Sequence, residues 1–214
     1  ATGRSAWIRL FDETSAALRF PFKKKSLTEA EILNLLSDTD PKTRKIAGKS
    51  LSEVLENNKR IFGMILNVIS RDRFIEDNKR GFKRIMSSRN LDNDVEDEVV
   101  DKLVDTIDKA MPKLTHRYYK WKANQFGQTR LDWWDRNAPL PHSSENLIKW
   151  SDAKDIILDS FSSFHPEISN LAELFFKNNW IDASLRKGKA SGAFAHPSVP
   201  SLHPYILVNY QGKI

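Results

Sequence analysis

The histidines of this 214-residue chain do not have the spacing of a zinc site. None begins an H-E-x-x-H sequence, and no two lie four residues apart, the separation that puts two imidazoles on one face of a helix. The chain has no cysteine, which excludes thiolate ligands and thiol catalysis. It also has no G-x-x-x-x-G-K-[ST] or G-x-G-x-x-G loop for phosphate. We therefore predict no catalytic residue and no metal ligand in this chain. The histidines are His116, His142, His165, His196 and His203.

Two further groups of polar side chains could do chemistry. Asp132 and Asp135 could form a carboxylate pair or bind a metal, but two acids beside two tryptophans more often cap a loop around a buried aromatic plug. His196 and His203 could reach a substrate if their loop lines a cleft, although Pro-flanked loop histidines are more often surface residues. We therefore assign catalysis to neither group.

The backbone of residues 190–194 could do chemistry of a different kind. Its run of small residues leaves the N–H and C=O groups unshielded, so that another extended chain could approach closely. An ordinary hairpin, in which the glycine shapes a bend, explains the same residues. The candidate substrate-binding residues are Ser191, Gly192, Ala193 and Phe194.

The pattern of strands is confined to the end of the chain. Residues 192–195 are small and short, and residues 205–210 are a β-branched and aromatic run bounded by Pro204 and Gly212. A loop rich in Pro and Ser separates them. These segments predict a small C-terminal β-hairpin or a pair of edge strands.

The first half of the chain has the periodicity of helices. Residues 5–18 have helical spacing and lead into a short extended segment. Ser26 and Glu29 match a capping box, which predicts a helix from there to about Leu36. Asp40, followed by Pro41, predicts the start of a long helix whose apolar stripe continues to about Ser70.

The second half is expected to be helical as far as residue 179. A helix is predicted over residues 73–86, with a break at 87–90 and an N-cap among 92–94. One apolar stripe then runs across Pro112, which we expect to bend the helix rather than end it. Two helices would thus exceed the usual upper length of about twenty residues. Ser151 is the predicted N-cap of the next helix, and residues 165–167 are predicted to begin the last one.

Composition limits the class of protein. A net charge of +6 and a pI near 9.4 allow a nucleic-acid partner, because clustered Lys and Arg neutralise phosphate. The basic clusters alternate with acidic residues, which is commoner on solvated helix faces. No apolar run approaches the roughly 20 residues that cross a bilayer, so no membrane partner is expected. The absence of cysteine fits a reducing compartment, with the cytoplasm as the default.

Several blocks near the end of the chain carry a resemblance to a known family. They are W-I-D-A at 180–183, G-K at 188–189, G-A-F at 192–194 and P-Y-I-L-V-N-Y-Q-G at 204–212. In this order they resemble the segment of oligoendopeptidase F-type enzymes, in the M3 family of zinc metallopeptidases, that precedes the H-E-x-x-H helix. The segments L-D-W-W-D at 131–135 and A-P-L at 138–140 match more loosely.

The resemblance implies a function for the intact protein. It implies a zinc-dependent endopeptidase that cleaves short, unstructured peptides, in which a metal-bound water attacks the carbonyl and the glutamate of the H-E-x-x-H motif acts as base. In that family the small-residue strand lines the cleft and pairs with the substrate backbone. By this resemblance, residues 191–194 would bind the substrate main chain.

We accordingly predict a mainly α protein. A long-helix lobe would span residues 1–179, and residues 180–214 would be the β strands that start a truncated catalytic part. The chain has no initiator Met and stops just past a strand, so we expect a piece of a larger enzyme, inactive alone and without bound zinc. Its expected partners are short peptides and the missing C-terminal catalytic part. Two alternatives stay open: a non-catalytic helical interaction protein and a basic nucleic-acid-binding domain.

Overall fold

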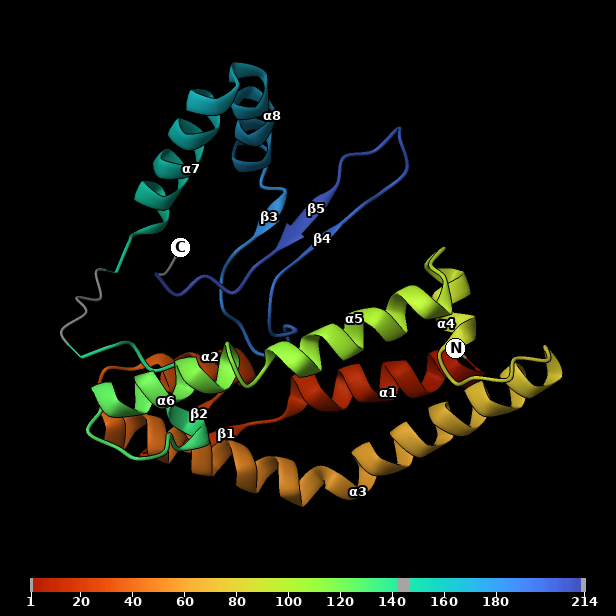
Figure 1. Cartoon of the computed structure of the whole chain (residues 1–214). Helices are drawn as coiled ribbons and strands as arrows, with labels where there is room; N and C mark the ends of the chain where they lie inside the picture. Colours follow the sequence, from red (N-terminus) through yellow and green to blue (C-terminus); the bar gives the residue numbers. More distant parts are fainter. Residues whose placement is uncertain (1, 142–146, 213–214) are drawn as a thin grey trace. The chain divides into compact units, whose positions relative to one another are not determined.

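The computed structural model describes residues 2–141 and 147–212, which are mainly α-helical as predicted (Figure 1). Contacts divide the chain into two compact units, described separately below. The first consists of residues 1–14 and 36–141, and the second of residues 15–35 and 142–214. The boundary expected between residues 179 and 180 concerns the parts of the intact enzyme and stays a prediction.

Helices make up the first unit. The longest, α3, has 39 residues and begins at the predicted position. Asp40 is its N-cap, because its carboxylate accepts from the N–H groups of Lys42 and Thr43, each at 3.1 Å. The hydroxyl of Thr43 and the N–H of Lys42 hold the pKa of Asp40 below its usual value. The elements are α1 (Gly3–Ala17, whose last residues belong to the second unit), η1 (Leu35–Ser37), α3 (Pro41–Lys79), α4 (Ser87–Asp92), α5 (Asp97–Ala110), α6 (Thr115–Gln125) and η2 (Trp133–Asp135).

The predicted end of α3 near Ser70 is wrong. The helix continues to Lys79, supported by the i,i+4 pair between Arg73 and Asp77, and ends before Gly81, whose φ of 77° is the left-handed conformation typical after a helix. Ser87 begins α4 where a break was expected. The hydroxyl of Ser87 donates to Asp97 at 2.5 Å, so contacts with the next helix stabilise this short one.

Pro112 ends a helix rather than bending it. The helix α5 stops at Ala110, and α6 begins only at Thr115. The N–H groups of Lys113 and Leu114 both donate to the Ala110 carbonyl, so the chain makes a turn there. Among the described helices, therefore, only α3 is longer than twenty residues. The predicted N-cap at residues 92–94 is also wrong, because Glu96 precedes α5.

A buried ion pair ties α3 to η2. Arg44 and Asp135 are 2.7 Å apart, with side chains 1% and 3% exposed. The Arg44 guanidinium also donates to the Asp38 and Thr39 carbonyls. The sequence had indicated a solvated basic face around Arg44 and a buried aromatic plug around Asp135. The charges are buried instead, whereas Trp133 is half exposed.

The second unit begins with a small hairpin. Strands β1 (Phe20–Phe22) and β2 (Lys25–Leu27) pair antiparallel, and helix α2 (Glu29–Asn34) follows. The predicted capping box is present two residues later than expected: Thr28 is the N-cap, and Glu31 returns a bond to the Thr28 N–H at 2.7 Å. Ser26 is unavailable because it lies in β2, opposite Pro21.

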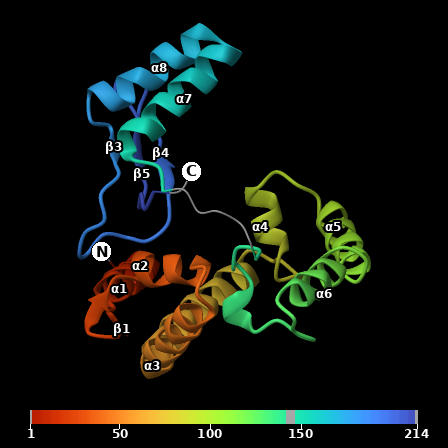
Figure 2. The same ribbon diagram turned by 90° about the vertical axis from the view of Figure 1, so that its left-hand side faces the viewer.

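Two helices lie side by side in the remainder of this unit, α7 (Trp150–Phe164) and α8 (Pro166–Lys177) (Figures 1 and 2). The last helix begins at residues 165–167 as predicted, and His165 is its N-cap, with Nδ1 accepting from the Glu167 N–H at 3.3 Å. Ser151 is not the N-cap of α7: that position is Lys149, and Ser151 lies in the first turn. The strands β3 (Ile181–Asp182), β4 (Phe194–His196) and β5 (Tyr205–Leu207) complete the unit.

Large apolar side chains remain exposed in the described part of the chain. The helix α5 has no buried residue, and one of its faces carries Val99, Leu103 and Ile107, each at least half exposed. No helix in the described ranges has both the length and the apolar character needed to cross a membrane.

Candidate functional site

A three-stranded sheet carries the candidate substrate-binding residues. Its order is β3-β5-β4, with β3 parallel and β4 antiparallel to the central β5. The predicted hairpin is therefore present as β4 and β5, but a third strand joins it. Within the described residues no strand pairs with the outer side of β4, which makes β4 an edge strand.

The pairing register shows which backbone groups face that open edge. Ile206 donates its N–H to the Trp180 carbonyl on the β3 side at 2.9 Å, so the neighbouring residues of β5 face β4. Leu207 is opposite Phe194, which places the backbone polar groups of Phe194 toward β5. Ala195 therefore directs its N–H and C=O outward, where an added strand could pair with them.

The four predicted residues lie at the start of this edge. Phe194 is the first residue of β4, and its side chain is half exposed. Ser191, Gly192 and Ala193 precede the strand and have no regular structure, and Gly192 has a φ of 86°. The structure thus places all four in one continuous segment. By the alternation of a strand, we expect Ala193 to face outward like Ala195.

A buried lysine holds the loop that leads to this segment. The Lys189 ammonium lies within 3.0 Å of four oxygens, and the side chain is only 1% exposed. These acceptors are the Asp182 carboxylate and the carbonyls of Asp182, Ser184 and Val208. Lys189 therefore binds the loop to β3 on one side and to the end of β5 on the other.

Asp182 carries the compensating negative charge. Arg186 makes a two-pronged contact with its carboxylate, at 2.6 and 2.5 Å, and Lys189 adds a third donor. The hydrogen bonds from Arg186 and then Lys189 lower the pKa of Asp182 to about 2. The carboxylate is therefore ionised at neutral pH, and it neutralises the buried ammonium.

Two more side chains hold residues 190–192. The Asn209 amide nitrogen donates to the carbonyls of Ala190 and Gly192, at 3.0 and 2.9 Å. The Ser191 hydroxyl donates to Glu29 of α2 at 2.5 Å. Sequence reasoning did not assign a role to Lys189 or Asn209, although both lie in the blocks that carried the resemblance, and it placed Glu29 in a capping box. Nothing in the local pattern indicated these distant partners.

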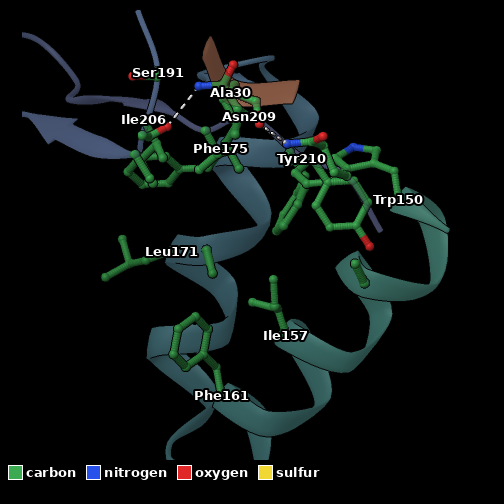
Figure 3. A pocket seen from close by; sticks show the side chains of 18 of the residues that line it. Ala30, Trp150, Ile157, Phe161, Leu171, Phe175, Ser191, Ile206, Asn209 and Tyr210 are labelled. Carbon is green, nitrogen blue, oxygen red and sulfur yellow. Dashed lines mark hydrogen bonds between the residues drawn. The ribbon is translucent and has the colours of Figure 1, made fainter. Parts of the chain in front are cut away.

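An apolar pocket of about 850 Å³ adjoins the segment (Figure 3). Facing sides of α7 and α8 form part of its lining, with Ile157 and Phe161 on one helix and Leu171 and Phe175 on the other. Residues 191–193, β3, β5 with the residues that follow it, and α2 supply the remainder. Tyr210 contacts Trp150 edge to face, with ring centroids 5.0 Å apart. Such a lining favours an apolar occupant.

The loop histidines are not gathered into a catalytic group. The His203 ring stacks on Trp180, with centroids 3.9 Å apart, and also contacts Tyr205. His196 is the last residue of β4 rather than a loop residue, and it is exposed. His142 lies outside the described residues. The carboxylate of Asp135 forms an ion pair with Arg44.

The described residues do not fit a metal site. Across residues 2–141 and 147–212, no three His, Cys, Asp or Glu side chains converge so as to hold a metal ion. What the site can offer is main-chain pairing at an open strand edge beside an apolar pocket.

The comparison with protein families gives one match over most of the chain. The model described as Peptidase family M3 matches residues 34–214. The matched range includes α3, the apolar pocket helices and the whole β3-β5-β4 sheet.

Curated relatives agree with the family match. The chain is 25% identical over 192 residues to oligopeptidase PepF of Bacillus subtilis, covering 89% of this chain and 28% of the relative. It is 28% identical over 203 residues to an oligoendopeptidase F homolog of Borreliella burgdorferi, covering 94% of this chain and 34% of the relative. The chain thus spans about a third of the length of these relatives.

Solved structures share the fold. PZ peptidase A, determined with an inhibitor, superposes with a TM-score of 0.84 at 18% identity, covering 98% of this chain and 38% of that protein. At this identity the likeness supports the fold alone.

Proposed function

Because this chain belongs to peptidase family M3, we propose that it is part of a zinc-dependent oligoendopeptidase that hydrolyses short, unstructured peptides. The observation that carries the proposal is the family match over residues 34–214. Family membership favours this function over a non-catalytic interaction protein or a nucleic-acid-binding domain. The cytoplasm remains the expected compartment.

The proposed contribution of these residues is positional. An extended peptide would add to the outer edge of β4, where the register leaves Ala195 unpaired, and its main chain would pair with the 191–195 segment. Main-chain pairing reads no side-chain sequence, so it suits an enzyme that accepts many peptides. The groups that bind zinc and transfer protons would come from other parts of the M3 polypeptide, and the isolated chain would be inactive.

The second proposed partner is the remaining part of that polypeptide. Relatives contain roughly three times as many residues as this chain, and the apolar face of α5 is exposed. Surfaces of this kind commonly mark contacts with other protein segments.

The proposed activity is tested on the intact protein with a quenched fluorescent peptide and a folded protein that contains the same sequence. We expect cleavage inside the short peptide and none in the folded protein. A zinc chelator should abolish cleavage, and added zinc should restore it. Absence of peptide cleavage by the zinc-loaded protein would refute the proposal.

The proposed edge is tested by Ala193→Pro and Ala195→Pro, each of which removes one outward N–H. We expect each substitution to lower kcat/KM by about tenfold, which corresponds to the upper end of the free energy that one hydrogen bond contributes. The zinc content should be unchanged. Ala195→Ser keeps the N–H and serves as the matched control. Equal kinetics in the proline and serine variants would argue against strand addition at this edge.

A further inference from the structure

The segment from Ala190 to Gly192 has no regular structure, yet it has three side-chain anchors. Gly188 and Gly192 both have positive φ, at 78° and 86°, so the chain changes direction on either side of Lys189 and Ser191. A loop of this kind would exchange among many conformations unless other groups held it. The holding contacts come from Lys189, Asn209 and Glu29.

Lys189 provides the anchor at the base of the loop. Its ammonium has three hydrogens and four oxygen neighbours, and a buried charge without such partners is costly. If the loop moved away from the sheet, the Lys189 ammonium would lose its acceptors, and the carbonyls of Ser184 and Val208 would lose their donor. Residue 189 is therefore held against β3 and the end of β5.

Asn209 provides the anchor at the segment itself. Both hydrogens of its amide are used, one on the carbonyl of Ala190 and one on the carbonyl of Gly192. This geometry fixes the peptide planes that join Ala190 to Ser191 and Gly192 to Ala193, and the hydroxyl of Ser191 is held by Glu29. The order of residues 190–192 thus depends on a side chain that lies two positions beyond β5 in the chain.

We propose that Asn209 and Lys189 are positioning residues, which hold the backbone of residues 190–192 ready for the edge pairing of a peptide. This inference rests on the proposed function and adds to it which side chains keep residues 190–192 ordered. A segment that is ordered before binding loses less conformational entropy when the peptide pairs with it. Asn209 contacts the segment directly, Lys189 holds the residue that precedes it, and neither is a catalytic residue.

The test is Asn209→Ala in the intact, zinc-loaded protein. We expect KM for a short peptide to rise about tenfold, as for the loss of two neutral hydrogen bonds, with kcat within about twofold. Amide hydrogen exchange of residues 190–193 should become faster. Asn209→Asp should raise KM at least as much, because its carboxylate would face two carbonyl oxygens. Lys189→Met should act in the same direction.

Asn58→Ala is the matched control. Asn58 likewise donates its amide to a backbone carbonyl, that of Val54 at 2.8 Å, but on α3 in the first unit. We expect its KM and the exchange of residues 190–193 to equal those of the wild type. Suppose that the wild-type protein cleaves peptides. If Asn209→Ala then has the KM of the wild type, or if amide exchange of residues 190–193 is unchanged in it, the positioning role is overturned. Failure of the wild type to cleave peptides would instead overturn the proposed function and the positioning role with it.

Discussion

Arg44 in the first unit and Lys189 in the second are both cations with side chains only 1% exposed, but their surroundings differ. The carboxylate that pairs with Arg44 is 3% exposed, whereas the one that pairs with Lys189 is 36% exposed. The planar Arg44 guanidinium joins one helix to a short 3-10 turn through directed bonds. The compact Lys189 ammonium contacts carbonyls from β3, from the loop after it and from the residue that follows β5.

The difference shows how a buried charge can serve two purposes. Around Arg44 both charges are sealed from water, and the pair holds a fixed junction between α3 and η2. Around Lys189 the negative partner reaches solvent and is shared with Arg186, so this anchor is weaker. It lies beside the segment for which we propose peptide binding.

Arg44→Met should have the largest effect on stability. It leaves Asp135 buried without its partner, which typically costs about 3–5 kcal/mol. The free energy of unfolding of the protein, measured in urea, should fall by that amount. Arg9→Met is the control, because the Arg9 pair with Glu13 has a similar distance but lies at the surface, with side chains 70% and 64% exposed. Equal stability of the two variants would contradict a structural role for the Arg44 pair.

Lys189→Met should cost less, about 2 kcal/mol, the range for losing hydrogen bonds to a charged group. The Asp182 carboxylate would still pair with Arg186 and would remain accessible to solvent. It would therefore not be left buried without a partner, as Asp135 would be. Urea unfolding compared with that of Arg44→Met measures the difference. A loss as large as that of Arg44→Met would show that the two anchors are equivalent.

Gly48→Ala tests how closely α3 packs against η2 at the junction around Arg44. An added Cβ would lie 2.9 Å from Trp134 Cβ and 3.2 Å from the Trp133 ring, so crowding of about 1–3 kcal/mol should exceed the helix-propensity gain of about 1 kcal/mol. The control is Gly63→Ala in the same helix, where nothing lies within 4 Å. It should be stabilising. Thermal unfolding of both variants tests the contrast, and equal shifts would contradict it.

The smallest effect concerns pH. The pKa of Asp182 is about 2 in the folded protein and 3.8 ordinarily, so the folded state binds its proton less readily. Its contribution to stability is complete above pH 3.8 and disappears as the pH falls toward 2. The difference in unfolding free energy between wild type and Asp182→Asn should therefore shrink across that range. A constant difference would show that the partly exposed Asp182 carboxylate contributes no charge-dependent stability.

Sequence reasoning located the candidate segment but not what holds it. Residues 191–194 and the strand beginning at residue 205 were identified from small-residue and β-branched patterns, and family resemblance gave them a role. Lys189, Asn209 and Glu29 were not identified as its supports, because their partners depend on the sheet register and on α2. The third strand, β3, was also missed, since two residues leave no periodicity.

Local signals in the sequence determined the mainly α class, the N-cap at Asp40 and the start of the last helix at residues 165–167. Each of these depends on neighbouring residues, whose chemistry is the same in any fold, whereas the family was indicated by the resemblance of the ordered blocks in residues 180–212. Tertiary structure decided the capping residue Thr28, because Ser26 pairs with Pro21 in the hairpin, and the burial of Arg44, because Asp135 of η2 lies beside it. In both cases a pairing with a residue outside the local pattern prevailed, whereas the longer α3 and the break at Pro112 follow from contacts and steric limits within the helices themselves.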